Sequence, residues 1–246
     1  MAVVPRLACT VLLVRDRGGL EVLMVERHEQ SHFASALVFP GGLVDPEDGD
    51  AGWAGLTVGE DPIDATERSV RIAGYRELHE ETGILLAQAE DAKDWRPPPP
   101  GERPFMEAVA AMGLKLDLDA MAPFAHWITP EMAPKRFDTH FRLCGIDTDH
   151  VAVHDGAETV SCEWISPARA LEMGEAGERR VLFPTKMNLK MLAQASSVDE
   201  AIAQARARRV VTVLPHIERR PDGAFLVIPA EAGYGVSEEP AGSMRP

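Results

Sequence analysis

The sequence predicts an α/β protein built around a mixed β-sheet. Strand-like runs alternate with capped segments of helical length along all 246 residues, and no internal repeat interrupts this order. The length allows one large domain or two small ones, and 45% hydrophobic against 26% charged residues is typical of a globular protein. Strands interleaved with helices and long-range returns favour a mixed sheet as the core.

The first half of the chain opens with a predicted hairpin. Residues 7–14 and 20–26 are β-rich and are separated by an Arg-Asp-Arg-Gly-Gly turn. A third strand ends at Pro40, and the Gly-, Asp- and Glu-rich residues 43–60 predict an exposed excursion. Asp61 followed by Pro62 is a helix start signal and Gly83 a stop, which predicts a helix over about 62–81.

The second half begins with a proline-rich surface connector at 95–104. Beyond it the patterns predict helices at 105–112, 166–173, 183–195 and 198–208, and strands at 127–128, 137–145, 159–165, 210–214 and 224–228. The last dozen residues are Gly-, Ser-, Glu- and Pro-rich and are expected to be loose. We expect residues 1–195 to form one domain with an insertion at about 46–60, and residues 196–246 to form a C-terminal helical extension packed on it.

The charge balance restricts the partners. Lys plus Arg number 25 against 39 for Asp plus Glu, a net charge of −14, which disfavours binding to nucleic acids and to anionic membranes. An anionic substrate would need a cluster of arginines or a divalent metal. No apolar run reaches the length of a membrane span. Three cysteines without CxxC spacing (Cys9, Cys144, Cys162) predict reduced thiols and a cytoplasmic protein. The sequence is also compatible with a homodimer.

Three carboxylates carry the strongest chemical signal. Glu77, Glu80 and Glu81 have the i, i+3, i+4 spacing that places side chains on one face of a helix. Clustered like charges repel unless a cation lies among them, and hard oxygen ligands suit Mg²⁺ or Mn²⁺. A solvated acidic helix face is the alternative interpretation.

The surrounding residues resemble the signature of the Nudix hydrolase family. That signature is Gly, five residues, Glu, seven residues, then an R-E-apolar-x-E-E-x-G-apolar run, whose last part matches Arg76 to Ile84 without a gap. The first part departs from the pattern, because Arg76 follows Gly42 by 34 residues where the uninterrupted signature has 14, so about 20 residues are inserted. The acidic position of the first half falls on Asp48 or Glu47, depending on which glycine begins it.

An interrupted signature of this kind resembles the Nudix branch that contains the peroxisomal acyl-coenzyme A diphosphatases. Residues 127–130 (Trp-Ile-Thr-Pro) and 135–141 (Lys-Arg-Phe-Asp-Thr-His-Phe) also resemble that branch. The L-L-T-x-T-(S/A) signature of the other coenzyme A branch is absent ahead of the box. The resemblance implies a Nudix-type α/β/α sandwich and a diphosphatase.

The resemblance also implies roles for individual residues. Glu77, Glu80, Glu81 and the backbone carbonyl of Gly42 would hold the metal, with Glu80 and Glu81 catalytic. Arg76, also part of the catalytic signature, is expected to pin the loop by an ion pair with Glu47 or Asp48. The general base is expected at Glu158, six residues before Trp164, with Asp155 and Glu81 as rivals and a solvated turn as the alternative.

Candidates for substrate binding are Arg27, Arg136 and Asp138. Arg27 ends a strand near the glycine turn and is as well explained as a surface arginine, while Arg136 and Asp138 head a strand with a functional or architectural role. The histidines show no HxH or HExxH spacing, so the sequence predicts no zinc site.

The leading hypothesis is therefore a Mg²⁺- or Mn²⁺-dependent hydrolase of a small nucleoside diphosphate derivative. Coenzyme A or acyl-coenzyme A would give adenosine 3′,5′-bisphosphate and a phosphopantetheine product. ADP-ribose, nucleotide sugars or damaged nucleotides are the alternative substrates. A non-catalytic Nudix-fold nucleotide sensor is the third hypothesis, disfavoured because all three helix carboxylates are present.

Overall fold

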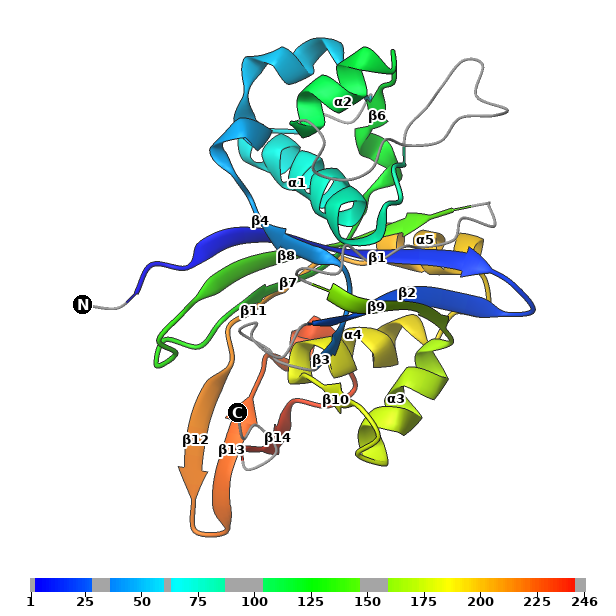
Figure 1. The fold of residues 1–246 in the computed structure, drawn as a ribbon. Helices are drawn as coiled ribbons and strands as arrows, with labels where there is room; N and C mark the ends of the chain where they lie inside the picture. Colours follow the sequence, from blue (N-terminus) through cyan, green and yellow to red (C-terminus); the bar gives the residue numbers. More distant parts are fainter. Residues whose placement is uncertain (1–2, 28–35, 60–62, 87–103, 147–158, 242–246) are drawn as a thin grey trace.

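A computed structural model describes residues 3–27, 36–59, 63–86, 104–146 and 159–241 (Figure 1). Within these residues a nine-stranded mixed sheet has helices on both faces, which confirms the α/β/α sandwich. The strand order is β10-β3-β2-β1-β8-β7-β11, with β4 also pairing β1 and β9 also pairing β2. No helix in this part of the chain is both long and apolar enough to cross a membrane.

The centre of the sheet is the predicted hairpin, β1 (Arg6–Asp16) and β2 (Leu20–Arg27). β1 pairs in parallel with β8 (Phe137–Gly145), which pairs antiparallel with β7 (Ala122–Ile128). β9 (Thr159–Ile165) lies beside β2, and the chain after β3 (Ala36–Val38) resumes as β4 (Gly41–Leu43) against β1. The short strands β10 (Arg180–Val181) and β11 (Thr212–Val213) close the two edges.

Two apolar clusters fill the faces of the sheet. On one face α1 (Ala65–Thr82) and α2 (Phe105–Ala111) pack over β1 and β2. On the other face α3 (Pro167–Glu175), α4 (Phe183–Leu192) and α5 (Val198–Ala207) contribute to the second cluster. Figure 1 shows α1 and α2 above the sheet and α3 and α4 below it.

The inserted stretch lies over the α1 face, outside the main sheet. It forms two short 3-10 helices (Pro46–Gly49 and Ala51–Gly55) and β5 (Thr57–Val58), which pairs with β6 (Leu116–Asp117) in a separate two-stranded sheet. A third 3-10 turn, Leu118–Ala120, follows β6. The expectation of an exposed excursion is wrong for Asp48 and Trp53, which are buried. Trp53 packs against Phe105 of α2 and belongs to the apolar cluster on the α1 face of the sheet, so the insertion is anchored on that core.

Two further expectations are corrected. α1 begins at Ala65 rather than at about 62, because the side chain of Asp64 accepts the backbone N–H of Glu67 and caps the helix there. The last dozen residues are not all loose, since β14 (Glu238–Pro240) pairs with β13 (Gly223–Val227), which also pairs with β12 (His216–Arg220). The described part of the C-terminal extension therefore contains α5, the edge strand β11 and a three-stranded sheet, in which the 3-10 turn Ala230–Ala232 connects β13 to β14.

Candidate active site

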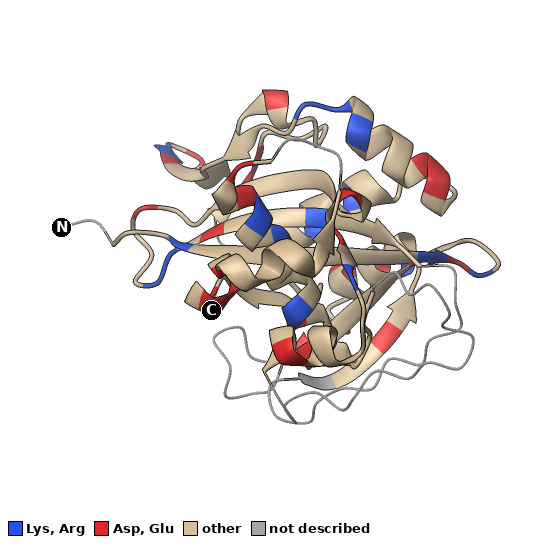
Figure 2. Ribbon diagram, turned by 90° about the horizontal axis from the view of Figure 1, so that it is seen from above, with Lys and Arg blue, Asp and Glu red and all other residues tan. Residues whose placement is uncertain are grey.

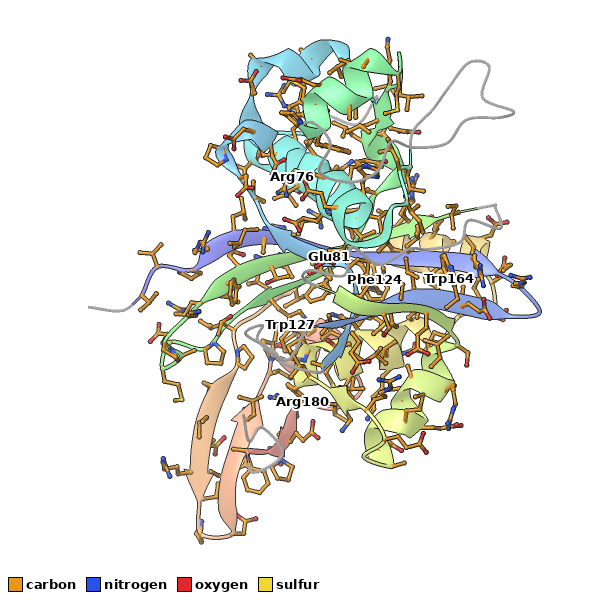
Figure 3. All side chains as sticks on the ribbon, viewed as in Figure 1. Arg76, Glu81, Phe124, Trp127, Trp164 and Arg180 are labelled. Atoms are coloured by element: carbon orange, nitrogen blue, oxygen red, sulfur yellow. The ribbon has the colours of Figure 1, made fainter. Side chains whose placement is uncertain are left out.

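The three predicted carboxylates lie on the last turns of α1, where the helix approaches β4. Gly83 ends the helix in the left-handed conformation (φ 68°), so the glutamates occupy its final regular turns. Their exposure is graded: the Glu80 side chain is 43% exposed, that of Glu77 13%, and Glu81 is buried. Figure 3 shows Arg76 on α1 and Glu81 where this helix meets the sheet.

Arg76 links the carboxylates to the insertion. Its Nε and Nη2 donate to the two oxygens of the buried Asp48, each at 3.0 Å, and Nη2 also donates to the Leu43 carbonyl at 2.8 Å. Its Nη1 donates to Glu77 at 2.8 Å and to Glu80 at 2.9 Å. Of the two partners that the sequence left open for Arg76, the structure thus pairs it with Asp48.

Burial and these contacts shift the pKa values of Arg76 and Glu80. Burial lowers the pKa of Arg76, but the hydrogen bond to Asp48 and the charges of Glu77, Asp48 and Glu80 outweigh it and raise the pKa. Burial raises the pKa of Glu80, against the opposing effect of Arg76. The guanidinium therefore stays charged and balances part of the negative charge.

Both glycines of the turn are required by close contacts. The Gly41 N–H donates to Oε2 of Glu81 at 2.9 Å, and a Cβ on Gly41 would lie 2.3 Å from the Cys9 carbonyl oxygen. A Cβ on Gly42 would lie 2.4 Å from the carboxylate carbon of Glu77. The two glycines of β4, which carry no side chain, thus let the α1 carboxylates approach the strand.

The predicted substrate-binding residues lie in different environments. Arg136 is buried, and its Nε and Nη1 donate to the backbone carbonyls of Thr129 (3.0 Å) and Val3 (2.9 Å). The sequence left open a functional or an architectural role for Arg136, and these contacts favour the architectural one. Arg27 ends β2, but its side chain lies outside the described residues. Glu158 and Asp155, the expected general base and its rival, also lie outside them.

Asp138 belongs to a cluster that sequence reasoning missed. Its Oδ1 accepts a hydrogen bond from Nε2 of His126 and lies 3.8 Å from Nε2 of His140, and the two imidazole rings stack with centroids 4.3 Å apart. Burial, with the charges of His126 and Arg142, lowers the pKa of His140 to about 4. The alternation of β8 places Asp138 and His140 on one face, but only the pairing of β7 with β8 brings His126 beside them.

Comparison with known proteins identifies the family. The model of the NUDT19 Nudix domain matches residues 60–191, which include α1 and its three glutamates. The chain belongs to this family. The Nudix chain is 25% identical over 272 residues to the acyl-coenzyme A diphosphatase NUDT19 of Homo sapiens, covering 88% of this chain and 72% of the relative. It is 27% identical over 238 residues to the Gallus gallus protein of the same name, covering 73% and 63%.

A solved structure supports the same assignment. The crystal structure of a NUDIX hydrolase from Alicyclobacillus acidocaldarius is 26% identical, with a TM-score of 0.70 over 81% of this chain and 96% of that one. The sequence-based identification of a Nudix hydrolase, with its mixed sheet and flanking helices, is confirmed. Nudix hydrolases act on pyrophosphate bonds and generally need a divalent metal.

Proposed function

We propose that this chain hydrolyses the pyrophosphate linkage of coenzyme A or acyl-coenzyme A, giving adenosine 3′,5′-bisphosphate and (acyl-)phosphopantetheine. One observation carries the proposal: the two halves of the interrupted Nudix box meet in the structure. Arg76 of the second half binds Asp48 of the first half, and Gly42 of the first half lies against Glu77 of the second. The substrate class is supported by the two relatives named acyl-coenzyme A diphosphatase.

The donors on α1 suit a hard divalent cation. Glu77, Glu80 and Glu81 offer carboxylate oxygens, and the missing side chain at Gly42 leaves its backbone close to Glu77. Glu80 is exposed enough to turn from Arg76 towards an ion. We propose Mg²⁺ or Mn²⁺ as the cofactor, which when bound neutralises charge on the pyrophosphate and acidifies a bound water.

The chain's own residues position these groups. Arg76 holds Asp48 and α1 together and orients Glu77 and Glu80 through one nitrogen, which makes it a positioning residue. The Gly41 N–H fixes one oxygen of Glu81. Glu158 stays our proposed general base, and Arg27 and Asp138 our proposed contacts to substrate.

The negative net charge of the protein means that an anionic substrate must be neutralised by cations at the site itself. Acidic and basic residues are interspersed over the described chain (Figure 2), and the net charge is −14. Coenzyme A carries a 3′-phosphate beside its pyrophosphate, so cations must be supplied at the site itself. The described cysteines are free thiols, which supports a reducing compartment such as the cytoplasm.

Product analysis tests the function. The full chain, freed of metal by chelation and then supplied with Mg²⁺ or Mn²⁺, is incubated with coenzyme A, 3′-dephospho-coenzyme A, an acyl-coenzyme A, ADP-ribose and a nucleotide sugar. The Glu80→Gln variant, purified in parallel, serves as control for contaminating hydrolases. We expect adenosine 3′,5′-bisphosphate from coenzyme A and from the acyl-coenzyme A, with 3′-dephospho-coenzyme A turned over more slowly.

The other outcomes discriminate the alternatives. Faster turnover of ADP-ribose or the nucleotide sugar keeps the Nudix chemistry and overturns the substrate class. Nucleotide binding by calorimetry without any turnover, in either metal, would identify a sensor and overturn the enzyme.

A further inference from the structure

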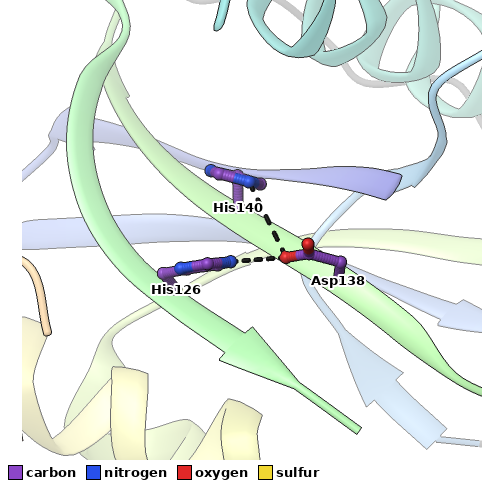
Figure 4. A group of neighbouring side chains, drawn as sticks. All are labelled: His126, Asp138 and His140. Carbon is purple, nitrogen blue, oxygen red and sulfur yellow. Dashed lines mark hydrogen bonds and ion pairs between the residues drawn. The ribbon is translucent and has the colours of Figure 1, made fainter. Parts of the chain in front are cut away.

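Two histidines and an aspartate converge on the α1 face of the sheet (Figure 4). His126 and His140 are directly paired across β7 and β8, and Asp138 precedes His140 by two residues on the same side of β8. One candidate ligand atom from each residue lies within 4.8 Å of the other two.

We propose that His126, Asp138 and His140 form a transition-metal site that is separate from the carboxylates of α1. Two imidazoles with one carboxylate are a ligand set for Zn²⁺ or Co²⁺ and a poor one for Mg²⁺, which prefers oxygen. Three protein ligands leave at least one position for water or for an oxygen of a bound molecule.

Neighbouring side chains determine how the imidazoles are held. Oγ1 of Thr212, on β11, lies 2.8 Å from Nδ1 of His126 and fixes that ring. Nη2 of Arg142 lies 3.3 Å from Nδ1 of His140 and donates to one oxygen of Glu67 at 2.5 Å, while the other oxygen of Glu67 accepts from Arg71.

Ion binding has a defined structural cost. The hydrogen bond between His126 and Asp138 must open, because both atoms would become ligands. The long contact from Arg142 to Nδ1 of His140 must also open. While Arg142 donates to Nδ1, the ring proton of a neutral His140 is on Nε2, and Nε2 must lose this proton to bind a metal ion. Both are local side-chain movements.

The site is accessible and lies apart from the α1 carboxylates. The side chains of His126, Asp138 and His140 are 19%, 31% and 21% exposed, so an ion can enter from solvent. Gly42 pairs with Cys9, and Cys9 with His140, which places the cluster two strands from Gly42, about 10 Å across the sheet. The ions of a binuclear centre lie about 4 Å apart, which is less than half of this backbone separation.

Metal titrations of the full chain test the site. Chelator-treated protein is titrated with Co²⁺ by visible absorption and with Zn²⁺ by calorimetry, both in excess Mg²⁺ to occupy the α1 carboxylates. We expect one Mg²⁺-resistant site per chain, weakened roughly 100-fold by His126→Asn or His140→Asn. His216→Asn, an exposed histidine on β12, and Glu77→Gln are controls expected to retain it.

Three results would overturn the proposal: no Mg²⁺-resistant site, unchanged binding in His140→Asn, or loss of the site in Glu77→Gln. If the histidine variants do not fold, the wild-type chain decides alone. Its imidazole ¹⁵N resonances should show Zn²⁺ bound at Nε2 of His126 and His140, and unchanged shifts of both would refute the site. Since no readout is activity, failure here leaves the proposed diphosphatase untouched.

Discussion

Arg76 and Asp48 form a two-pronged ion pair across 28 residues of sequence, with both hydrogen bonds at 3.0 Å. The pair fastens the insertion to α1, and the same guanidinium contacts Glu77 and Glu80. The insertion therefore lengthens the Nudix box without separating its two halves.

Asp48→Asn should destabilise the protein by about 3 kcal/mol, because it leaves the Arg76 charge without its buried partner. Asp45→Asn is the matched control, since Asp45 lies 3.6 Å from the same guanidinium but is half exposed, and should cost about 1 kcal/mol or less. Urea unfolding measures both. Equal losses in the two variants would contradict the role assigned to the buried pair.

Glu80→Gln should reduce activity in Mg²⁺ roughly 100-fold or more, because removing one carboxylate weakens neutralisation of the ion. Its free energy of unfolding should change by no more than about 1 kcal/mol, since the side chain is substantially exposed. Glu172→Gln on α3 serves as the exposed-helix control. Steady-state kinetics with wild-type turnover in Glu80→Gln would reject the metal-site assignment.

Gly42→Ala should impair activity far more than stability. The added methyl group would overlap the carboxylate of Glu77. The flexible Glu77 side chain can avoid this overlap only by moving away from β4. We expect a loss of about 1 kcal/mol or less in stability with a large fall in metal affinity. Gly55→Ala, which meets no atom within 4 Å, should be unchanged in both respects, and normal metal affinity in Gly42→Ala would count against the site.

Arg136→Ala should lower stability by about 3 kcal/mol, because two backbone carbonyls lose their charged donor. The ratio of coenzyme A to 3′-dephospho-coenzyme A turnover should stay constant, measured beside Arg169→Ala as an exposed control. A well-folded variant with a reduced ratio would instead restore the substrate-binding role that the sequence predicts.

Tyr234→Phe should destabilise the chain by about 2 kcal/mol, since its hydroxyl accepts from Trp127 (2.8 Å) and donates to Asn188 (2.9 Å) in the core. Burial raises the pKa of Tyr234 to about 12. A raised pKa means that the unfolded chain loses this proton first, so wild-type stability should fall between about pH 10 and pH 12, and less so in the variant. Thermal unfolding measured across this pH range tests the prediction. The same loss of stability with pH in both proteins would contradict the raised pKa of Tyr234.

The sequence by itself determined the features that depend on local spacing. The i, i+3, i+4 spacing of Glu77, Glu80 and Glu81 and the stop at Gly83 predict three clustered carboxylates at the end of α1, and β-rich runs bounded by turn residues predict most strands of the sheet. These features follow from the helix period and from local residue preferences, which are properties of a few neighbouring residues.

Only the tertiary structure decided which distant groups meet. Asp48 rather than Glu47 pairs with Arg76 because the 3-10 turn buries one carboxylate and not the other. Arg136 binds backbone carbonyls, and β14 completes a sheet where composition predicts a loose tail. His126 reaches Asp138 and His140 through strand register, which hydrogen bonding between whole strands sets and no local spacing encodes.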